Sequence, residues 1–187
     1  GVESSLGNNW VWDLLVDSEG RLWAASAGGF HLYLPEVDGF TNFSSDKNIE
    51  GVNGASYVSI TEAPNGNILF ASQFSGYTEY DIHTGNFKSY LYKNQNNSNP
   101  ISDLVFDKSG NLWITSPQNG LILRKVNQDT YANIPLENTN YRLMNLFIDA
   151  NNTLWIGSEN SGVFVLNQAL EVIQHFQFDP NNSSSLC

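Results

Sequence analysis

Residues 107–116 read DKSGNLWITS, and related decapeptides begin at residues 17, 63 and 149. The four copies align without a gap, and successive copies start 46, 44 and 42 residues apart. A repeat of this length across a whole chain indicates one supersecondary unit that recurs, because such units bury their apolar faces by stacking. The sequence therefore predicts four copies of one structural unit.

Each repeat divides into four short apolar segments bounded by turn residues, the pattern that β-strands show. In the fourth copy these segments cover residues 143–148, 153–157, 162–166 and 171–176. No segment shows the sustained apolar spacing of an amphipathic helix. Four strands in every 42 to 46 residues predict one β-propeller blade per repeat. We expect an all-β fold, a β-propeller with four four-stranded antiparallel blades that forms part of a larger propeller.

The expected boundaries follow the repeats. We expect residues 1–187 to be a single β-propeller fragment, with blades at about 10–45, 56–92, 101–135 and 142–178 and a linker toward a further blade at 179–187. An incomplete ring leaves blade faces exposed, and exposed apolar faces drive association. Self-association through these faces is therefore expected.

The residues that recur most regularly are predicted to be scaffold. The Asp side chain can accept hydrogen bonds from backbone N–H groups two or three residues on. The Gly that follows it adopts the left-handed conformation easily, and Asn152, which replaces this Gly in the fourth copy, is the next most favourable residue there. The Trp is expected to start the second strand and to pack between neighbouring blades. The scaffold residues are Asp17, Gly20, Trp23, Gly66, Asp107, Gly110, Trp113, Asp149 and Trp155.

The pattern Asp-x-x-Gly-Asn-Leu-Trp-Ile-x-Ser/Thr, followed by a Gly at the third strand, resembles the two-component regulator propeller repeat. The resemblance covers about Trp10 to Phe178. It implies the ligand-sensing, extracytoplasmic (periplasmic) part of a bacterial inner-membrane protein, as in hybrid two-component systems and related sensor kinases or diguanylate cyclases. It also implies recognition of a small molecule, often an oligosaccharide. The second copy departs at Ala63 and Leu69, so its blade boundary is expected to pack differently.

Charge narrows the class of partner. Lys and Arg number 8 against 19 Asp and Glu, for a formal net charge of -11. Nucleic acid and anionic membrane surfaces are therefore not expected partners, because both attract clustered Lys and Arg. The same acidity favours a neutral or cationic ligand over a sulfated one. The one cysteine, Cys187, excludes a Cys-x2-Cys zinc site, and neither a metal nor a cofactor is expected.

Candidate binding residues lie in the loops that enter each first strand and in the loops between second and third strands. These loops differ between copies while the scaffold repeats, as binding loops on a rigid frame do. Aromatic planes beside amide groups suit the C–H faces and hydroxyls of sugars. The candidates are Trp10, Asn53, Tyr57, Phe74, Gln118, Tyr141, Arg142 and Glu159.

Two other functions stay open. The first is a structural or protein-interaction propeller that mediates dimerisation. The second is a propeller lyase or glycosidase, but three scattered arginines and the histidines at 31, 83 and 175 form no constellation. Arg21 precedes the Trp of its repeat and is expected to point outward into solvent. No catalytic residue is assigned, and the chain is not expected to be an enzyme.

Overall fold

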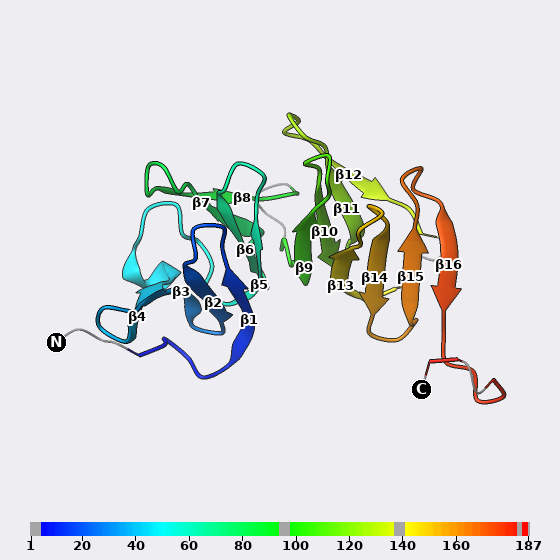
Figure 1. The fold of residues 1–187 in the computed structure, drawn as a ribbon, viewed down its shortest axis with the longest axis horizontal. Coiled ribbons are helices and arrows are strands. Elements are labelled where there is room, and N and C mark those ends of the chain that lie inside the picture. The colour runs from blue at the N-terminus through cyan, green and yellow to red at the C-terminus, as the bar shows by residue number, and fades with distance from the viewer. Residues whose placement is uncertain (1–4, 94–97, 137–140, 183–184, 187) are drawn as a thin grey trace. The chain divides into compact units, whose positions relative to one another are not determined.

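The computed structural model describes residues 5–93, 98–136, 141–182 and 185–186, and it folds them mainly into β-strands (Figure 1). Within these ranges four sheets each contain four strands, and every strand pairs antiparallel with its sequence neighbour. We call the sheets blades 1 to 4. A short 3-10 helix, Ser45–Lys47, follows blade 1.

The strand bounds follow the repeats closely. Blade 1 contains β1 (Val11–Val16), β2 (Leu22–Ser26), β3 (Gly29–Leu34) and β4 (Gly39–Phe43); blade 2 contains β5 (Tyr57–Glu62), β6 (Ile68–Ser72), β7 (Tyr77–Tyr80) and β8 (Phe87–Tyr90); blade 3 contains β9 (Asp103–Phe106), β10 (Leu112–Ser116), β11 (Gly120–Arg124) and β12 (Tyr131–Ile134); blade 4 contains β13 (Leu143–Ile148), β14 (Leu154–Ser158), β15 (Val163–Leu166) and β16 (Val172–Phe176). The prediction of four four-stranded antiparallel blades is confirmed.

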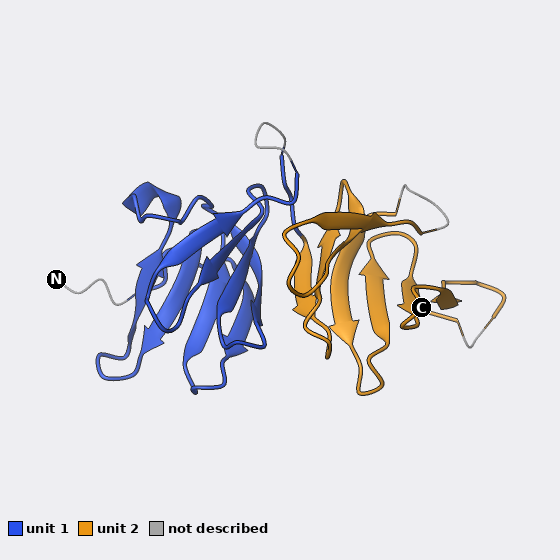
Figure 2. Ribbon diagram, turned by 90° about the horizontal axis from the view of Figure 1, so that it is seen from above, with its two compact units in different colours: residues 1–101 blue, residues 102–187 orange. Residues whose placement is uncertain are grey.

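Two compact units make up the chain (Figure 2). Residues 1–101 form unit 1, with blades 1 and 2, and residues 102–187 form unit 2, with blades 3 and 4. That all four blades belong to a single domain stays a prediction.

The core of unit 1 is aromatic. Trp23 is fully buried, and its ring lies 5.3 Å from both Phe70 and Tyr80 of the neighbouring blade. Phe30 stacks on Phe70 with ring centroids 3.9 Å apart. Such pairs add to the large apolar area that the rings bury. The prediction that the repeated tryptophan packs between blades is confirmed for Trp23.

The core of unit 2 is mainly aliphatic. Trp113 joins a buried cluster that includes Leu123 of its own blade and Leu154 and Leu166 of blade 4. The prediction of inter-blade packing therefore holds for Trp113 as well. Trp155 is only half-buried, and it stacks on Phe176 of its own blade at 6.2 Å.

Each repeated Asp holds the tryptophan six residues later. Asp17 Oδ1 accepts from the N–H groups of Glu19 (3.1 Å) and Arg21 (2.9 Å), and Oδ2 accepts from the Trp23 indole at 2.8 Å. Asp107 and Asp149 repeat this pattern, with indole distances of 3.0 and 3.1 Å. The backbone donors lie two and four residues on, so the expected donor at three residues was wrong.

The second copy shows that its turn forms without a carboxylate. The Ala63 N–H donates to Asn67 O and the Gly66 N–H donates to Ala63 O, both at 2.8 Å, which are the backbone bonds of the other three turns. Gly66 has φ 85 and Asn152, at the same repeat position, has φ 61, so the predicted left-handed conformation is confirmed. The main role of the Asp is therefore to hold the tryptophan indole, because the backbone bonds of the turn form without it.

Candidate functional site

The predicted binding loops meet at one end of the blade in three of the four copies. There the residue after the second strand donates its N–H to a carbonyl in the segment that enters the first strand. These hydrogen bonds join Ala27 to Trp10 (3.0 Å), Gln73 to Ser56 (3.0 Å) and Glu159 to Arg142 (2.9 Å). We call this the loop end of the blade. Pro117 takes the position in blade 3 and has no N–H to donate.

A serine at the end of each second strand fixes the following turn. Its hydroxyl accepts a backbone N–H two or three residues on, as Ser/Thr turns commonly do. The pairs are Gly28 to Ser26 (3.0 Å), Ser75 to Ser72 (3.2 Å), Asn119 to Ser116 (3.2 Å) and Ser161 to Ser158 (2.8 Å). The rigid turns position the variable side chains at the loop end.

One of these serines belongs to a polar chain that resembles a catalytic triad. His31 Nε2 lies 2.7 Å from Ser26 Oγ, and Nδ1 lies 2.6 Å from Asn42 Oδ1. Both Ser26 and His31 are fully buried, and burial lowers the pKa of His31, an effect that outweighs the opposing effect of the hydrogen bond to Asn42 Oδ1. Because the hydroxyl also caps a turn and is closed to solvent, the cluster is structural.

A pocket of about 480 Å³ lies at the loop end of unit 2, and we call it the loop-end pocket. Gln118 and Asn119 line it from the turn between β10 and β11, Asn133 lines it from β12, and Tyr141 lines it from the segment that enters β13. Leu121 and Leu143 are among its apolar lining. The pocket thus combines an aromatic ring, three amide groups and an apolar wall.

Four of the predicted binding residues belong to unit 2. Gln118 and Tyr141 line the loop-end pocket, and the Tyr141 ring lies 4.7 Å from Phe164. The next residue, Arg142, forms an ion pair with Glu159, with Nη1 and Oε2 2.6 Å apart. Both side chains are about half exposed, so this pair orients the loop with little gain in stability.

The other four predicted residues belong to unit 1, and one of them is misplaced. Trp10, Asn53 and Phe74 are exposed, with Trp10 70% accessible beside a surface pocket. Tyr57 is fully buried, its ring lies 5.0 Å from Phe30, and burial raises its pKa. It therefore offers no face to a ligand, because its ring fills the core.

Tyr57 holds a loop instead of a ligand. Its hydroxyl accepts the Gly54 N–H at 3.1 Å and lies 2.9 Å from Thr78 Oγ1. A buried hydroxyl needs such partners. These bonds fix the loop that carries Asn53.

The expectation that Arg21 points into solvent is also wrong. Its Nε lies 2.7 Å from Asp17 Oδ2, and its Nη1 lies 3.0 Å from Glu19 Oε2. The guanidinium lies 5.9 Å from the centre of the Trp23 ring, within the range of a cation–π contact. Arg21 is thus part of the blade 1 scaffold.

Sequence reasoning missed two carboxylates that join blades. Asp13 Oδ2 accepts the Ile60 N–H of blade 2 at 2.8 Å, and Asp103 Oδ2 accepts the Leu146 N–H of blade 4 at 2.7 Å. Both Asp residues stand four positions before the repeated turn Asp, so their shared repeat position was a usable signal.

The part of the chain that the structure describes contains neither a metal-binding cluster nor a helix that could span a membrane. Among those residues no three or more His, Cys, Asp or Glu side chains gather as a metal site would require. No helix in the same part of the chain is long and apolar enough to cross a membrane.

Comparisons with known proteins agree with this architecture. Residues 5–28 and 96–118 match the family model of the two component regulator propeller. No curated protein matches the chain significantly. Two extracellular domains, described as parts of hybrid two component systems from B. thetaiotaomicron, match with TM-scores of 0.80 and 0.73, at 20% and 19% identity over 96% and 92% of this chain.

The present chain spans 24% and 22% of those two structures. A virginiamycin B lyase from Staphylococcus aureus matches with a TM-score of 0.69 at 17% identity, over 94% of this chain and 57% of the lyase. At these identities the structural matches show the fold, a β-propeller with blades of this kind. Residues 5–28 and 96–118, which contain the first and third copies of the decapeptide motif, are the segments that are similar to the two component regulator propeller.

Proposed function

We propose that the chain is a ligand-sensing β-propeller segment from the extracytoplasmic part of a bacterial two-component-type receptor. The family match at residues 5–28 and 96–118 carries this proposal. The fold it shares with extracellular domains of hybrid two component systems supports it. Within the receptor the segment binds a small molecule in the periplasm, and other parts transmit the signal.

The ligand that fits the loop-end pocket best is a neutral oligosaccharide. The Tyr141 ring offers a flat face for the C–H groups of a sugar, and Gln118, Asn119 and Asn133 can both donate and accept hydrogen bonds. Pockets of this type bind through an apolar wall and a few placed polar groups. The net charge of -11 disfavours a polyanionic glycan.

A thermal-shift screen of neutral trisaccharides tests this assignment, with a sulfated disaccharide as the charged comparison. A neutral ligand at about 100 times its dissociation constant should stabilise the fold by about 2.7 kcal/mol. Gln118→Ala should remove about half of that shift, because the loss of one hydrogen bond weakens binding about tenfold. It should leave the ligand-free melting temperature unchanged, because the side chain is exposed. Gln128→Ala, an exposed glutamine elsewhere in unit 2, is the matched control. A shift that Gln118→Ala leaves intact would remove the site from this pocket.

A role as an interaction platform is the second candidate. One face of β1 exposes Trp12, Leu14 and Val16, each more than half accessible, and β13 exposes Phe147 to 63%. Phe147 lies opposite Trp155 in the β13–β14 pairing. Trp155 stands at the repeat position of Trp23 and Trp113, which pack against the next blade. The occupant we infer for the β1 face is blade 4 of a second copy, which would repeat the contact that the chain already makes twice. Light scattering should then show concentration-dependent association that Leu14→Lys abolishes, and a monomer at high concentration would contradict it.

A catalytic role is not part of this proposal. The serine and histidine of the Ser–His–Asn chain described above are buried, and the serine caps a turn. The virginiamycin B lyase resembles this chain in fold at 17% identity, which gives no support to catalysis here.

A further inference from the structure

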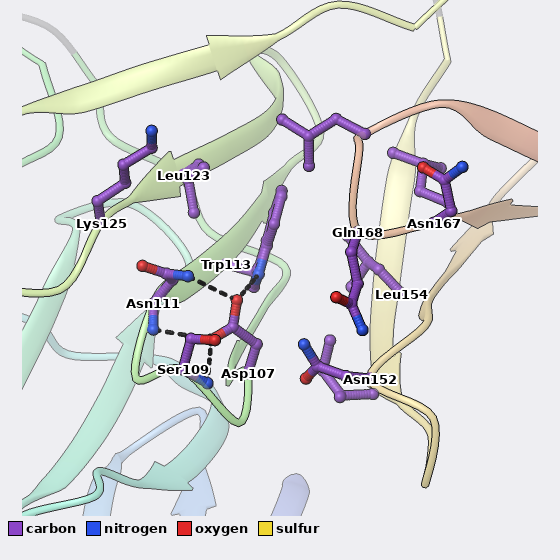
Figure 3. A pocket seen from close by; sticks show the side chains of 13 residues that line it. Asp107, Ser109, Asn111, Trp113, Leu123, Lys125, Asn152, Leu154, Asn167 and Gln168 are labelled. Atoms are coloured by element: carbon purple, nitrogen blue, oxygen red, sulfur yellow. Dashed lines mark hydrogen bonds between the residues drawn. The ribbon is translucent and has the colours of Figure 1, made fainter.

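Unit 2 has a second pocket, at the end of blades 3 and 4 opposite to the loop end (Figure 3). It holds about 250 Å³ and lies between the β9–β10 turn of blade 3 and two segments of blade 4, the β13–β14 turn and the β15–β16 connection. We call it the turn-end pocket. It is a separate site from the loop-end pocket, since β10 runs from one pocket to the other with Leu112 and Ser116 at its two ends.

The rim of this pocket carries hydrogen-bonding groups that face one another. Ser109 comes from blade 3, and Asn152 and Gln168 come from blade 4, on the other side of the pocket (Figure 3). Asn152 accepts the Lys108 N–H through Oδ1 at 2.9 Å, which holds the side chain and leaves its Nδ2 group to donate. Gln168 donates through Nε2 to Asn151 O at 3.4 Å, which leaves its Oε1 to accept.

The carboxylate in the pocket is already satisfied. Asp107 Oδ1 accepts from the Ser109 and Asn111 N–H groups, both at 2.9 Å, and Oδ2 accepts from Asn111 Nδ2 at 2.8 Å and Trp113 Nε1 at 3.0 Å. Four donors use the capacity of one carboxylate. A ligand would therefore find no free acceptor site on this carboxylate.

The interior of the pocket is apolar and has the size of one ring. Trp113, Leu123 and Leu154 line it below the polar rim with 4–5% of their surface accessible, and Leu166, which also lines it, is fully buried. An apolar cavity of about 150 Å³ holds benzene, so about 250 Å³ accommodates one six-membered ring with its substituents. An apolar wall with few polar groups at the opening is the general construction of a small-molecule site.

The equivalent space in unit 1 is filled by larger side chains, which explains why the pocket forms in unit 2. Arg21 stands at the repeat position of Asn111, Tyr80 at that of Leu166 and Ile82 at that of Gln168. Arg21 and Tyr80 lie against Trp23, and the Ile82 Cδ1 atom lies 2.8 Å from the position that a Cβ on Gly66 would take. Asn111 keeps the hydrogen bond to the turn Asp with a shorter side chain than that of Arg21.

We propose that the turn-end pocket is a second binding site, for a small neutral polyhydroxylated molecule the size of one sugar ring. The hydroxyls bond to Ser109, Asn152 and Gln168, and the C–H face of the ring lies on the narrow accessible edges of Trp113, Leu123 and Leu154. The exposed Lys125 at the rim adds one further donor. This site does not depend on the function proposed for the loop-end pocket.

The test is an NMR titration of the whole chain with D-glucose, D-galactose, D-mannose, D-xylose and myo-inositol in the millimolar range. At least one of them should shift the Trp113 indole N–H and the side-chain amides of Asn152 and Gln168. Gln168→Ala removes one hydrogen bond at an exposed position, so the chain should fold as before and bind about tenfold more weakly. Leu166→Tyr, which restores the unit 1 residue, should abolish the shifts by filling the pocket.

The control variant is Gln118→Ala, which changes only the loop-end pocket and should leave these shifts intact. Either of two results would overturn the proposal: no probe perturbs the three reporter signals, or the shifts persist unchanged in both Gln168→Ala and Leu166→Tyr. Loss of the shifts in Gln118→Ala alone would assign the binding to the loop-end pocket and so also refute it.

Discussion

The interface between blades 1 and 2 and the interface between blades 3 and 4 use the same anchor with different neighbours. In both, a turn Asp accepts the indole N–H of a tryptophan that packs against the next blade. Around Trp23 the neighbours are aromatic rings and a guanidinium, whereas around Trp113 they are leucines and an amide. The repeat therefore specifies the backbone and the anchor, and a few flanking residues decide whether an interface is closed or open.

Blade 2 extends this comparison. Its turn has Ala63 at the Asp position and its second strand has Leu69 at the Trp position, yet its backbone bonds are unchanged. A leucine has no side-chain N–H, so a carboxylate at the Asp position would have no indole donor to accept from. The loss of the Asp and the loss of the Trp in blade 2 therefore have the same physical explanation, the absence of the indole–carboxylate hydrogen bond.

The largest expected effect is the removal of an anchored tryptophan. Trp23→Ala should lower the free energy of unfolding by about 3–5 kcal/mol, because it creates a cavity and leaves Asp17 without its indole donor. Trp155→Ala should cost less, since that ring is half-buried. Urea unfolding of the two variants measures the difference. Equal losses would show that inter-blade burial does not govern the anchor's contribution.

The anchor carboxylate should contribute less than the ring. Asp107→Asn is expected to cost about 1–3 kcal/mol, because the new amide points N–H atoms at existing donors. Asp129→Asn, in the exposed connection between β11 and β12 of the same blade, is the matched control and should be neutral. Urea unfolding also measures this pair. A neutral Asp107→Asn would mean that the turn tolerates the loss of the carboxylate next to Trp113 as it does next to Leu69.

The same anchor should make stability depend on pH. Burial opposes ionisation of Asp17, but hydrogen bonds from the Trp23 indole and the Arg21 backbone and side chain outweigh it and hold the pKa of Asp17 below its ordinary value. The Thr153 N–H and the Trp155 indole lower the pKa of Asp149 likewise. A lowered folded-state pKa adds stability that is fully present above the unfolded pKa of about 3.9 and is lost as pH falls through the folded value.

We therefore expect the free energy of unfolding to fall as pH is lowered below about 4, and to fall less steeply in Asp17→Asn. Denaturant unfolding at a series of acidic pH values measures both slopes. Identical slopes in the two proteins would show that Asp17 contributes nothing to the acid transition.

The smallest effect should come from exchanging neighbours between the interfaces. Leu166→Tyr in unit 2 is expected to change the free energy of unfolding by less than about 1.5 kcal/mol, since the new ring enters an existing pocket. Tyr80→Leu in unit 1 should destabilise, because it removes a ring from contact with Trp23. A large loss in Leu166→Tyr would show that the turn-end pocket is narrower than its volume indicates.

Much of the fold could be read from the repeats. The strand bounds of the fourth copy differ from prediction by at most one residue, since turn residues and apolar segments alternate sharply there. The candidate site was harder to predict. Gln118 and Tyr141 do share a pocket, whereas Tyr57 had the composition of a binding residue and turned out to fill the core. Whether a ring at the start of a strand faces a neighbouring blade or the solvent depends on what packs against it.

By itself the sequence determined the blade repeat, the turns and the tryptophan that each blade presents, because these depend on local hydrogen bonding and on the period of apolar residues. Only the tertiary structure decided which side chains cover that tryptophan. It joined Asp13 and Asp103 to the neighbouring blade's inner strand, and it left a pocket beside Trp113 where Tyr80 closes the equivalent space beside Trp23. The reason is that such contacts join residues some 43 to 57 positions apart, and whether they fit depends on shape in three dimensions.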